Sequence, residues 1–347
     1  MKVISRIHTI SHFSSKQFNQ YFGGMRIGVF DIETLGLKPD TCPMVLAGFM
    51  TTDDEGNCTI NQYFAETPEE ENQILARLCE DFKKVDYLFT YNGKHFDIPF
   101  ITRRAKLLGV QSPDENIYNL DLYLVLNGHS EIRYLLRNLK QKTVEIYMGL
   151  SDSRDDEISG AESIKLYKAY LEAIDLDEKN SLEEKILLHN HDDLLQLYQL
   201  MPILKQVHIH KAFYNLGFPI MGESGWPLLS ISAIKTSTLG ISIAGKYSGE
   251  KFSYISYDSF DKYYSCEFKE DGTFSFNIRV DKHKGNIFIN LPYFFQDYEE
   301  FKVYPNYIKN FLLVSNNNNL SYLELNMFIK KFMLKFMEDN ICPTAIL

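Results

Sequence analysis

Several residue classes that mark other kinds of protein are scarce in this sequence. It contains only five cysteines, an odd number, and no two of them form a Cys-x-x-Cys pair. This usage argues against a disulfide framework and a cysteine-based zinc site, and is typical of reduced thiols in a cytoplasmic protein. No apolar run reaches the roughly 18 to 20 residues of a membrane helix, and the first residues lack the apolar core of a secretion signal. We therefore expect a cytoplasmic protein without a membrane partner.

Positive charge is also in short supply. The 36 basic and 46 acidic residues give a formal net charge of −10, which argues against nonspecific affinity for nucleic acid. The excess is uneven, because residues 206–347 hold 14 residues of each sign and residues 1–205 hold all of the surplus acid. Carboxylates that bind metal ions would account for part of this surplus.

The first two hundred residues alternate between strand and helix patterns. The predicted strands lie at 26–34, 44–51, 59–64, 87–91 and 117–126, with a hairpin turn at 53–57. The first predicted helix begins at Thr67-Pro68, and the others lie near 98–108, 131–148, 162–174 and 182–206. Strands in a meander followed by alternating helices and strands predict a mixed α/β sheet with helices packed on it.

The pattern changes after residues 215–227, which are rich in glycine and proline and are typical of a linker. Beyond it, strand segments are predicted near 228–234, 238–244, 252–257, 263–269, 273–280 and 286–293, and a final helix near 320–337. Aromatic residues alternate along these strands, an arrangement that serves either as a core or as a base-stacking surface.

Two carboxylates stand one residue apart at the end of the first predicted strand, in Phe30-Asp31-Ile32-Glu33-Thr34. Residues i and i+2 of a strand point to the same face, so Asp31 and Glu33 project together. Adjacent carboxylates repel each other unless a cation lies between them, and oxygen ligands suit a divalent ion. Alone, the pair is a weak signal.

Two further stretches place acidic residues on helices. Asn92-Gly93-Lys94-His95-Phe96-Asp97-Ile98-Pro99 brings Asp97 to a helix N-terminus, as either a cap or a site residue. In the second stretch, His189 lies one turn before Asp193, so the two share a helix face as either a surface ion pair or a functional pair.

Asp-x-Glu-Thr, Asn-Gly-x-x-Phe-Asp-x-Pro and the x-Asn-x-x-Asp helix together resemble the three motifs of the ribonuclease H-like 3′–5′ exonucleases of the DEDD superfamily. More narrowly, the chain resembles the bacterial YprB-like group, also at Leu120–Leu122, Arg137–Lys140 and Asp155–Gly160. The resemblance covers roughly residues 25–205. It implies a ribonuclease H-like mixed α/β sheet flanked by helices, followed by a β-rich C-terminal domain that ends in a helix.

The expected domains are an N-terminal extension at 1–24, the exonuclease domain at 25–214, the linker at 215–227 and a β-rich accessory domain at 228–347. Carried over to this sequence, the resemblance implies that Asp31, Glu33, Asp97 and Asp193 hold two Mg²⁺ or Mn²⁺ ions. Four carboxylates and no clustered cysteine favour such ions over zinc.

The general base is where this sequence departs from better-known branches of the family. One branch has tyrosine four residues before the last aspartate, and another has histidine five residues before it. Here His189 takes the tyrosine position, next to Asp193, and an imidazole with a pKa near about 6.5 is a better base at neutral pH than a phenol. Whether His189 abstracts a proton or only positions the water stays open.

The resemblance also implies contacts from Thr34, Leu35, Asn92 and Phe96 to the terminal nucleotide. We therefore expect a metal-dependent 3′–5′ exonuclease that hydrolyses phosphodiester bonds by a two-metal mechanism. Its partner would be nucleic acid, DNA or RNA, with a single-stranded 3′ end. Two alternatives are a catalytically inactive nucleic-acid-binding or scaffolding protein with this fold, and a structure-specific endonuclease.

Overall fold

The computed structural model describes residues 1–53, 55–150, 158, 160–223, 226–260, 262–317 and 319–342. Most of the predicted feature at Asp155–Gly160, part of the predicted linker and the last five residues lie outside this description. The described chain forms two compact units. The first comprises residues 1–19, 23–115 and 119–207, and the second comprises residues 20–22, 116–118 and 208–347.

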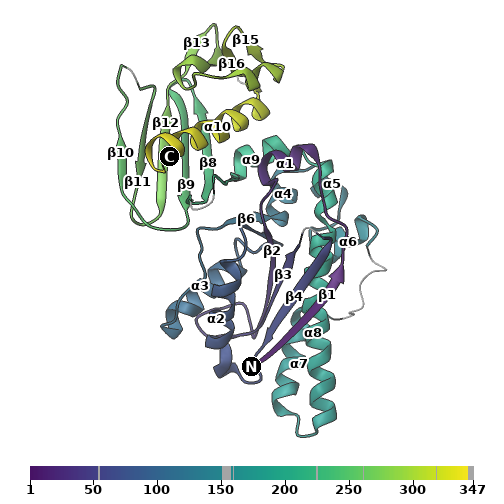
Figure 1. Cartoon of the computed structure of the whole chain (residues 1–347). Coiled ribbons are helices and arrows are strands. Elements are labelled where there is room, and N and C mark those ends of the chain that lie inside the picture. The colour runs from purple at the N-terminus through teal and green to yellow at the C-terminus, as the bar shows by residue number, and fades with distance from the viewer. Residues whose placement is uncertain are drawn as a thin grey trace. The chain divides into compact units, whose positions relative to one another are not determined.

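A mixed six-stranded sheet forms the centre of the first unit, with the strand order β1-β4-β3-β2-β5-β6. Its strands are β1 (Lys2–Thr9), β2 (Ile27–Thr34), β3 (Met44–Thr52), β4 (Asn57–Phe64), β5 (Tyr87–Thr90) and β6 (Tyr118–Asp121). β2 pairs antiparallel with β3 and parallel with β5. Figure 1 shows α2 and α3 on one side of this sheet and α7 and α8 on the other.

The helices up to residue 206 are mostly short, and α8 is the longest of those described. They are α1 (Lys16–Phe22), α2 (Glu71–Phe82), α3 (Asp97–Leu108), α4 (Leu122–His129), α5 (Ile132–Leu135), α6 (Gln141–Tyr147), α7 (Gly160–Glu172) and α8 (Leu176–Gln199), with 3₁₀ turns η1 (Pro68–Glu70) and η3 (Met201–Gln206). The predicted mixed α/β fold with a helix-flanked sheet is therefore confirmed.

Alternate residues of β2 face opposite helical layers. The Phe30 ring lies 5.4 Å from the ring of Phe82 on α2. The next residue, Asp31, points the other way and accepts a hydrogen bond from Asn190 on α8. The side of the sheet that carries the carboxylates is therefore the side covered by α8.

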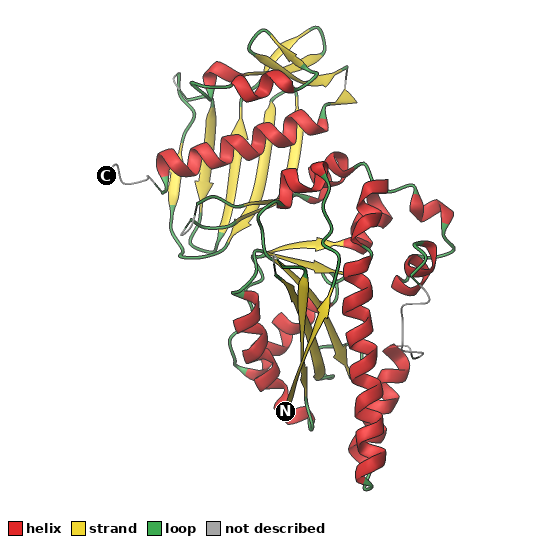
Figure 2. Cartoon of the chain, turned by 45° about the vertical axis from the view of Figure 1, so that its right-hand side comes forward, coloured by secondary structure: helices red, strands yellow, loops and turns green. Residues whose placement is uncertain are grey.

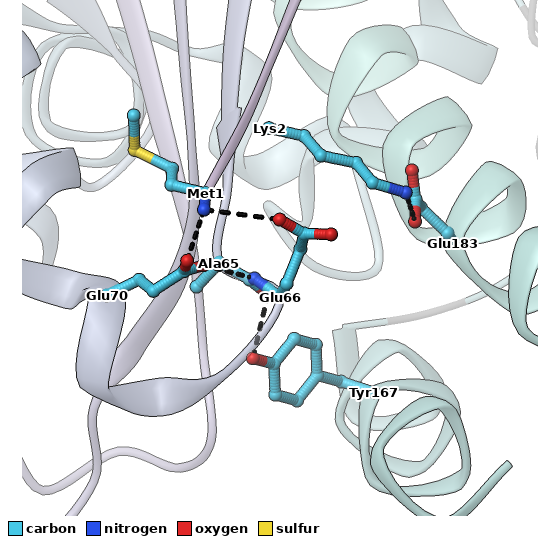
Figure 3. Close-up of polar contacts among 7 residues, drawn as sticks. All are labelled: Met1, Lys2, Ala65, Glu66, Glu70, Tyr167 and Glu183. Atoms are coloured by element: carbon cyan, nitrogen blue, oxygen red, sulfur yellow. Dashed lines mark hydrogen bonds and ion pairs between the residues drawn. The ribbon is translucent and has the colours of Figure 1, made fainter. Parts of the chain in front are cut away.

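β1 lies in the region 1–24, which was predicted to be an N-terminal extension. It pairs antiparallel with β4 from Lys2–Phe64 to Thr9–Asn57. Figure 3 shows its first residues, where the Met1 amine contacts Glu66 and Glu70, and Lys2 Nζ lies 2.7 Å from Glu183 of α8. These ion pairs fix the start of β1 to the turn after β4 and to α8. Burial lowers the pKa of the Met1 amine, but the two carboxylates more than offset this and raise it above its ordinary value.

Two predicted elements have different boundaries in the structure. The strand expected at 117–126 ends at Asp121, because that side chain accepts a hydrogen bond from the Leu124 amide at 3.3 Å and starts α4. The helix expected at 131–148 is divided into α5 and α6.

The second unit is β-rich and ends in a long helix, as predicted (Figure 2). One sheet has the order β10-β11-β12-β9-β8-β7, and a smaller one has the order β13-β14-β16-β15, with β17 paired to β16. The strands are β7 (Pro219–Ile220), β8 (Leu229–Ser237), β9 (Gly240–Tyr247), β10 (Tyr254–Ser256), β11 (Tyr264–Phe268), β12 (Thr273–Ile278), β13 (Asp281–His283), β14 (Asn286–Asn290), β15 (Tyr307–Ile308), β16 (Phe311–Asn316) and β17 (Asn319–Leu320). The helices are α9 (Ile209–Leu216) and α10 (Tyr322–Asn340), with 3₁₀ turns η4 (Leu291–Tyr293) and η5 (Glu299–Val303).

Aromatic residues form much of the core of this unit. Phe276 of β12 lies 4.9 Å from Phe336 of α10, and Phe268 of β11 stacks on the same ring. Phe274 and Phe276 are both buried, which supports the core interpretation of the alternating aromatics at these positions. No helix in the described part of the chain is both long and apolar enough to cross a membrane.

Candidate metal centre

The first two carboxylates of the candidate site come from the end of β2. Asp31 is half-buried and Glu33 is buried, and both face α8. Between Glu33 and Thr34 the pairing with β3 shifts by one residue, so that Glu33 is opposite Leu46 whereas Thr34 is opposite Met44. Such a bulge reorients the side chains at the end of a strand, and bulges are common next to functional sites.

Helix α8 completes one side of the site with His189 and Asp193. The imidazole Nε2 of His189 lies 3.6 Å from Glu33 Oε1 and 3.7 Å from Asp193 Oδ2. Among the described residues, these three offer ligand atoms that lie within 4.8 Å of one another. Because His189 is only 3% exposed, the His189–Asp193 pair is not a surface ion pair.

Asp97 approaches the site from the start of α3. It is the first residue of the helix, and the cap position belongs to Phe96, whose side chain makes no capping bond. Burial raises the pKa of Asp97 to about 7, with the charges of Asp121 and Glu33 adding to the effect and the backbone amides of Asp97 and Ile32 opposing it. Asp97 is therefore a buried carboxyl with an acidic neighbourhood, as a metal ligand without its ion would be.

Asp31 lies in strongly acidic surroundings. Burial raises its pKa well above the ordinary value, and the charges of Asp97, Asp193 and Glu33 raise it further. The amide of Asn190 opposes this by donating a hydrogen bond to Asp31 Oδ2 at 2.9 Å. The electrostatics therefore link all four predicted ligands, although the group that lies within 4.8 Å includes His189 in place of Asp31 and Asp97.

The donor set fits divalent cations that prefer oxygen. Four carboxylates concentrate negative charge, and their mutual repulsion is relieved when a cation binds between them. Carboxylate oxygens are typical ligands of Mg²⁺ and Mn²⁺, and the His189 nitrogen is also acceptable to Mn²⁺. An acidic cluster suited to a divalent cation is thus present, whereas the ligand role of each residue stays a prediction.

The residues predicted to contact the terminal nucleotide have defined local structures. The Thr34 hydroxyl donates to the Gly36 carbonyl at 2.9 Å, and Leu35 packs against the hydrophobic cluster beneath α7 and α8. Asn92 has a left-handed backbone with φ of 63°. Phe96 is half-buried, with its ring 5.5 Å from that of Phe100. Their contacts to nucleotide remain predictions.

Asp121 explains how the Asn92 turn is held. Its carboxylate accepts hydrogen bonds from the Asn92 amide at 2.9 Å and the Lys94 amide at 3.0 Å, in addition to starting α4. This geometry gives Asp121 a structural role. It also couples the turn before Asp97 to the end of β6.

A family model places this fold among known proteins. The model of the family RNase_H_2, described as RNase_H superfamily, matches residues 29–205, just over half of the chain. The chain belongs to the RNase_H superfamily. The matched region contains all four predicted metal ligands and His189.

Individual relatives of this RNase_H superfamily member are more distant. A DNA polymerase of Methanocaldococcus jannaschii is 31% identical over 78 residues, which cover 21% of this chain and 5% of the polymerase. A DNA polymerase of Pyrococcus glycovorans is 22% identical over 231 residues, which cover 62% of this chain and 28% of the polymerase. The chain therefore spans less than a third of the length of either curated relative.

Solved structures are similar over part of the chain at low identity. The family B DNA polymerase from Pyrobaculum calidifontis has a TM-score of 0.40 and 22% identity, covering 52% of this chain and 24% of that one. A structure of exonuclease I has a TM-score of 0.36 and 13% identity, with 70% and 55% covered. An exonuclease I from Methylocaldum szegediense has a TM-score of 0.31 and 14% identity, with 63% and 54% covered.

The polar residue that contacts Asp31 is Asn190, for which no role was predicted. Asn190 lies within the quoted motif of this superfamily member, one residue after His189, and is completely buried. The available signal was a polar residue on the helix face between Ile186 and Leu194, which stand four residues before and after it and are both apolar. Its partner on the sheet, Gln62 of β4, is also completely buried, and its position in a strand gave no such signal.

Proposed function

We propose that this protein is a metal-dependent 3′–5′ exonuclease that hydrolyses phosphodiester bonds in single-stranded DNA or RNA. The observation that carries the proposal is the convergence of four buried or half-buried carboxylates, Asp31, Glu33, Asp97 and Asp193, on one edge of an RNase_H superfamily fold. We further propose that the chain belongs to the narrower YprB-like group and acts in the cytoplasm.

The four carboxylates would hold the metal ions. Two Mg²⁺ or Mn²⁺ ions, when bound, would activate the attacking water and stabilise the leaving 3′ oxygen. Before binding, Asp97 has to lose the proton that its pKa of about 7 allows it to keep at neutral pH. The His189 imidazole lies close to two of these carboxylates, those of Glu33 and Asp193.

His189 is proposed as the group that accepts a proton from the attacking water. Its Nε2 lies 3.6 Å from Glu33 Oε1 and 3.7 Å from Asp193 Oδ2, next to two of the predicted metal ligands. The competing role is that of a metal ligand, which the 4.8 Å grouping also permits. His189→Ala separates the two, because loss of a base slows cleavage and alters its pH profile, whereas loss of a ligand weakens Mn²⁺ binding.

A basic and aromatic segment beside the site, residues 133–141, supports a nucleic-acid substrate. The Tyr91 hydroxyl donates to the Leu139 carbonyl at 2.6 Å, and the Gln141 amide donates to the Asp193 carbonyl at 3.0 Å, so residues 139–141 are fixed to both sides of the site. Arg137 and Lys140 are exposed there, and exposed cationic side chains favour contact with phosphates.

An exposed ring at the start of this segment offers a stacking surface. The Tyr134 side chain on α5 is 73% exposed, and the Arg133 guanidinium lies 4.9 Å from the centre of its ring. Unpaired bases stack on aromatic rings and on arginine, whereas a duplex keeps its bases in its own stack. The segment therefore favours a single-stranded substrate over a duplex.

The test is cleavage of a 5′-labelled single-stranded oligonucleotide, as DNA and as RNA, in Mn²⁺ or Mg²⁺. We expect wild type to shorten the strand stepwise from its 3′ end, and Asp31→Asn to remove the activity. Asp177→Asn, the same change of side chain at an exposed position in the first turn of helix α8, is the control and should retain it.

Three results would contradict the proposal in different ways. Equal activity of purified Asp31→Asn and wild type would assign the cleavage to another site. Cutting of a circular single strand would indicate an endonuclease, because a circle has no end. Absence of both Mn²⁺ binding in calorimetry and cleavage would favour an inactive binding or scaffolding protein.

A further inference from the structure

Four residues form a straight row across the sheet beside the candidate metal centre. Ile4 of β1 pairs with Gln62 of β4, Gln62 pairs with Gly48 of β3, and Gly48 pairs with Asp31 of β2. Gly48 therefore separates a buried amide from a predicted metal ligand. A side chain from α8 that lies over Gly48 can reach both Gln62 and Asp31.

Asn190 occupies the space above Gly48. A Cβ atom on Gly48 would lie 2.3 Å from Asn190 Oδ1 and 2.5 Å from Leu194 Cδ1, which is closer than side chains tolerate. From this position Asn190 Nδ2 donates to Asp31 Oδ2 at 2.9 Å, and Asn190 Oδ1 accepts from Gln62 Nε2 at 2.9 Å. Glycine in the row is thus what allows the helix side chain to bridge β4 and β2.

The groups at the ends of this network determine which atom donates and which accepts in each of its hydrogen bonds. Gln62 Nε2 also donates to the Leu187 carbonyl at 2.8 Å, and Gln62 Oε1 accepts from the Arg6 guanidinium at 2.9 Å. A backbone carbonyl only accepts and a guanidinium only donates, so the Gln62 amide has one possible orientation. Gln62 must then donate to Asn190 Oδ1, which leaves the NH₂ group of Asn190 to face Asp31.

We propose that Gln62 and Asn190 are positioning residues that orient the Asp31 carboxylate for divalent-cation binding, an inference that rests on the proposed function. The Asn190 bond holds Oδ2 of Asp31 and fixes the plane of the carboxylate, so that its other oxygen is presented to the cation. Gln62 acts only through Asn190, whose amide it prevents from turning over.

A neutral amide is well suited to this task. A lysine or arginine donor at the same place would fix the carboxylate too, but its positive charge would compete with the cation for Asp31. Both amides are completely buried, so water cannot easily take over their hydrogen bonds. Partners of metal ligands in other proteins typically contribute about 10- to 100-fold to metal affinity.

The experiment measures Mn²⁺ affinity by calorimetry on the full chain, together with cleavage over a range of Mn²⁺ concentrations. Gln62→Met keeps the length of the side chain and removes its polar atoms, and Gln62→Glu replaces a donor with an acceptor. We expect each to weaken Mn²⁺ binding by about 10- to 100-fold. Because all four carboxylates remain, the maximal cleavage rate should recover at high Mn²⁺, which a general structural defect would not allow.

Asn61→Ala provides the matched control. Asn61 is the neighbouring residue of β4, and it makes an exposed cross-strand hydrogen bond to Ser5 of β1 at 2.6 Å. Successive strand residues point to opposite faces, so its loss should leave Mn²⁺ affinity unchanged. Melting curves recorded without metal identify variants that do not fold.

The outcomes distinguish this inference from the proposed function. A wild-type chain that binds no Mn²⁺ would refute the metal site itself. Wild-type affinity in folded Gln62→Met would overturn the positioning role and leave the metal site standing. If both Gln62 variants fail to fold, Asn190→Ser decides, because a shorter hydroxyl that cannot span to Asp31 must weaken Mn²⁺ binding if the inference is right.

Discussion

Replacing Gly48 by alanine should damage both the stability of the sheet–helix layer and the metal centre. The added methyl group would lie 2.3 Å from Asn190 Oδ1 and 2.5 Å from Leu194 Cδ1, whereas ordinary contacts begin near 3.4 Å. Asn190 therefore has to withdraw by about 1 Å, and its 2.9 Å bond to Asp31 would exceed hydrogen-bonding distance.

The size of the effect follows from two contributions. Overpacking of a close contact costs roughly 1 to 3 kcal/mol, and the lost hydrogen bond to a charged group costs about 1.5 to 3 kcal/mol. Because the two share one side chain they do not add fully, and we expect a loss of about 2 to 4 kcal/mol in the free energy of unfolding. For a unit of this size, each kcal/mol lowers the melting temperature by roughly 2 to 4 °C.

Urea unfolding and thermal melting, followed by circular dichroism, measure this loss, and calorimetry measures the accompanying drop in Mn²⁺ affinity. Gly128→Ala is the control, since Gly128 lies in α4 and nothing lies within 4 Å of the position that an added methyl group would take. Alanine is the better helix former, so this variant should be unchanged or more stable by about 0.5 to 1 kcal/mol. If the unfolding curves and the Mn²⁺ affinity of Gly48→Ala matched those of wild type, they would contradict the close approach of α8 to β3.

Two further predictions concern charge. Burial raises the pKa of Asp97 to about 7, so the folded metal-free protein keeps a proton there that the unfolded chain loses near pH 4. The stability that this retained proton contributes is present in acid and is lost as the pH rises toward 7. Mn²⁺ affinity should rise over the same interval, and equal affinity in calorimetry at pH 5.5 and 7.5 would refute the assignment of Asp97 as a ligand. Arg137→Ala should weaken the binding of a single-stranded oligonucleotide and lower the slope of log affinity against log salt by about 0.7, as measured by fluorescence anisotropy in the absence of metal. An unchanged slope would show that Arg137 contacts no phosphate.

The carboxylate pair on β2 was predictable from sequence because strand geometry leaves no choice. Residues i and i+2 must share a face, and Asp31 and Glu33 do point together toward α8. The same holds for His189 and Asp193, which helix geometry brings to one face. Turn residues likewise located the hairpin between β3 and β4.

Other features depended on tertiary contacts that no local pattern encodes. Lys2–Thr9 shows no apolar–polar alternation in its sequence, and only its pairing with β4 makes it part of the sheet. The sequence between 131 and 148 favours one helix, yet Leu139 and Gln141 are held by Tyr91 and by the Asp193 carbonyl, which interrupts it. The Gln62–Asn190 bridge joins residues 128 positions apart.

The pairing of β1 has a consequence for handling this protein. Without it, β4 would be an outer strand with unpaired backbone amides and carbonyls, and such strands attract the edges of other molecules. A shortened form beginning after Thr9 would therefore tend to self-associate through β4. It would also lack Arg6, so a truncation chosen to improve crystals could lower metal affinity by a route unrelated to the ligands themselves.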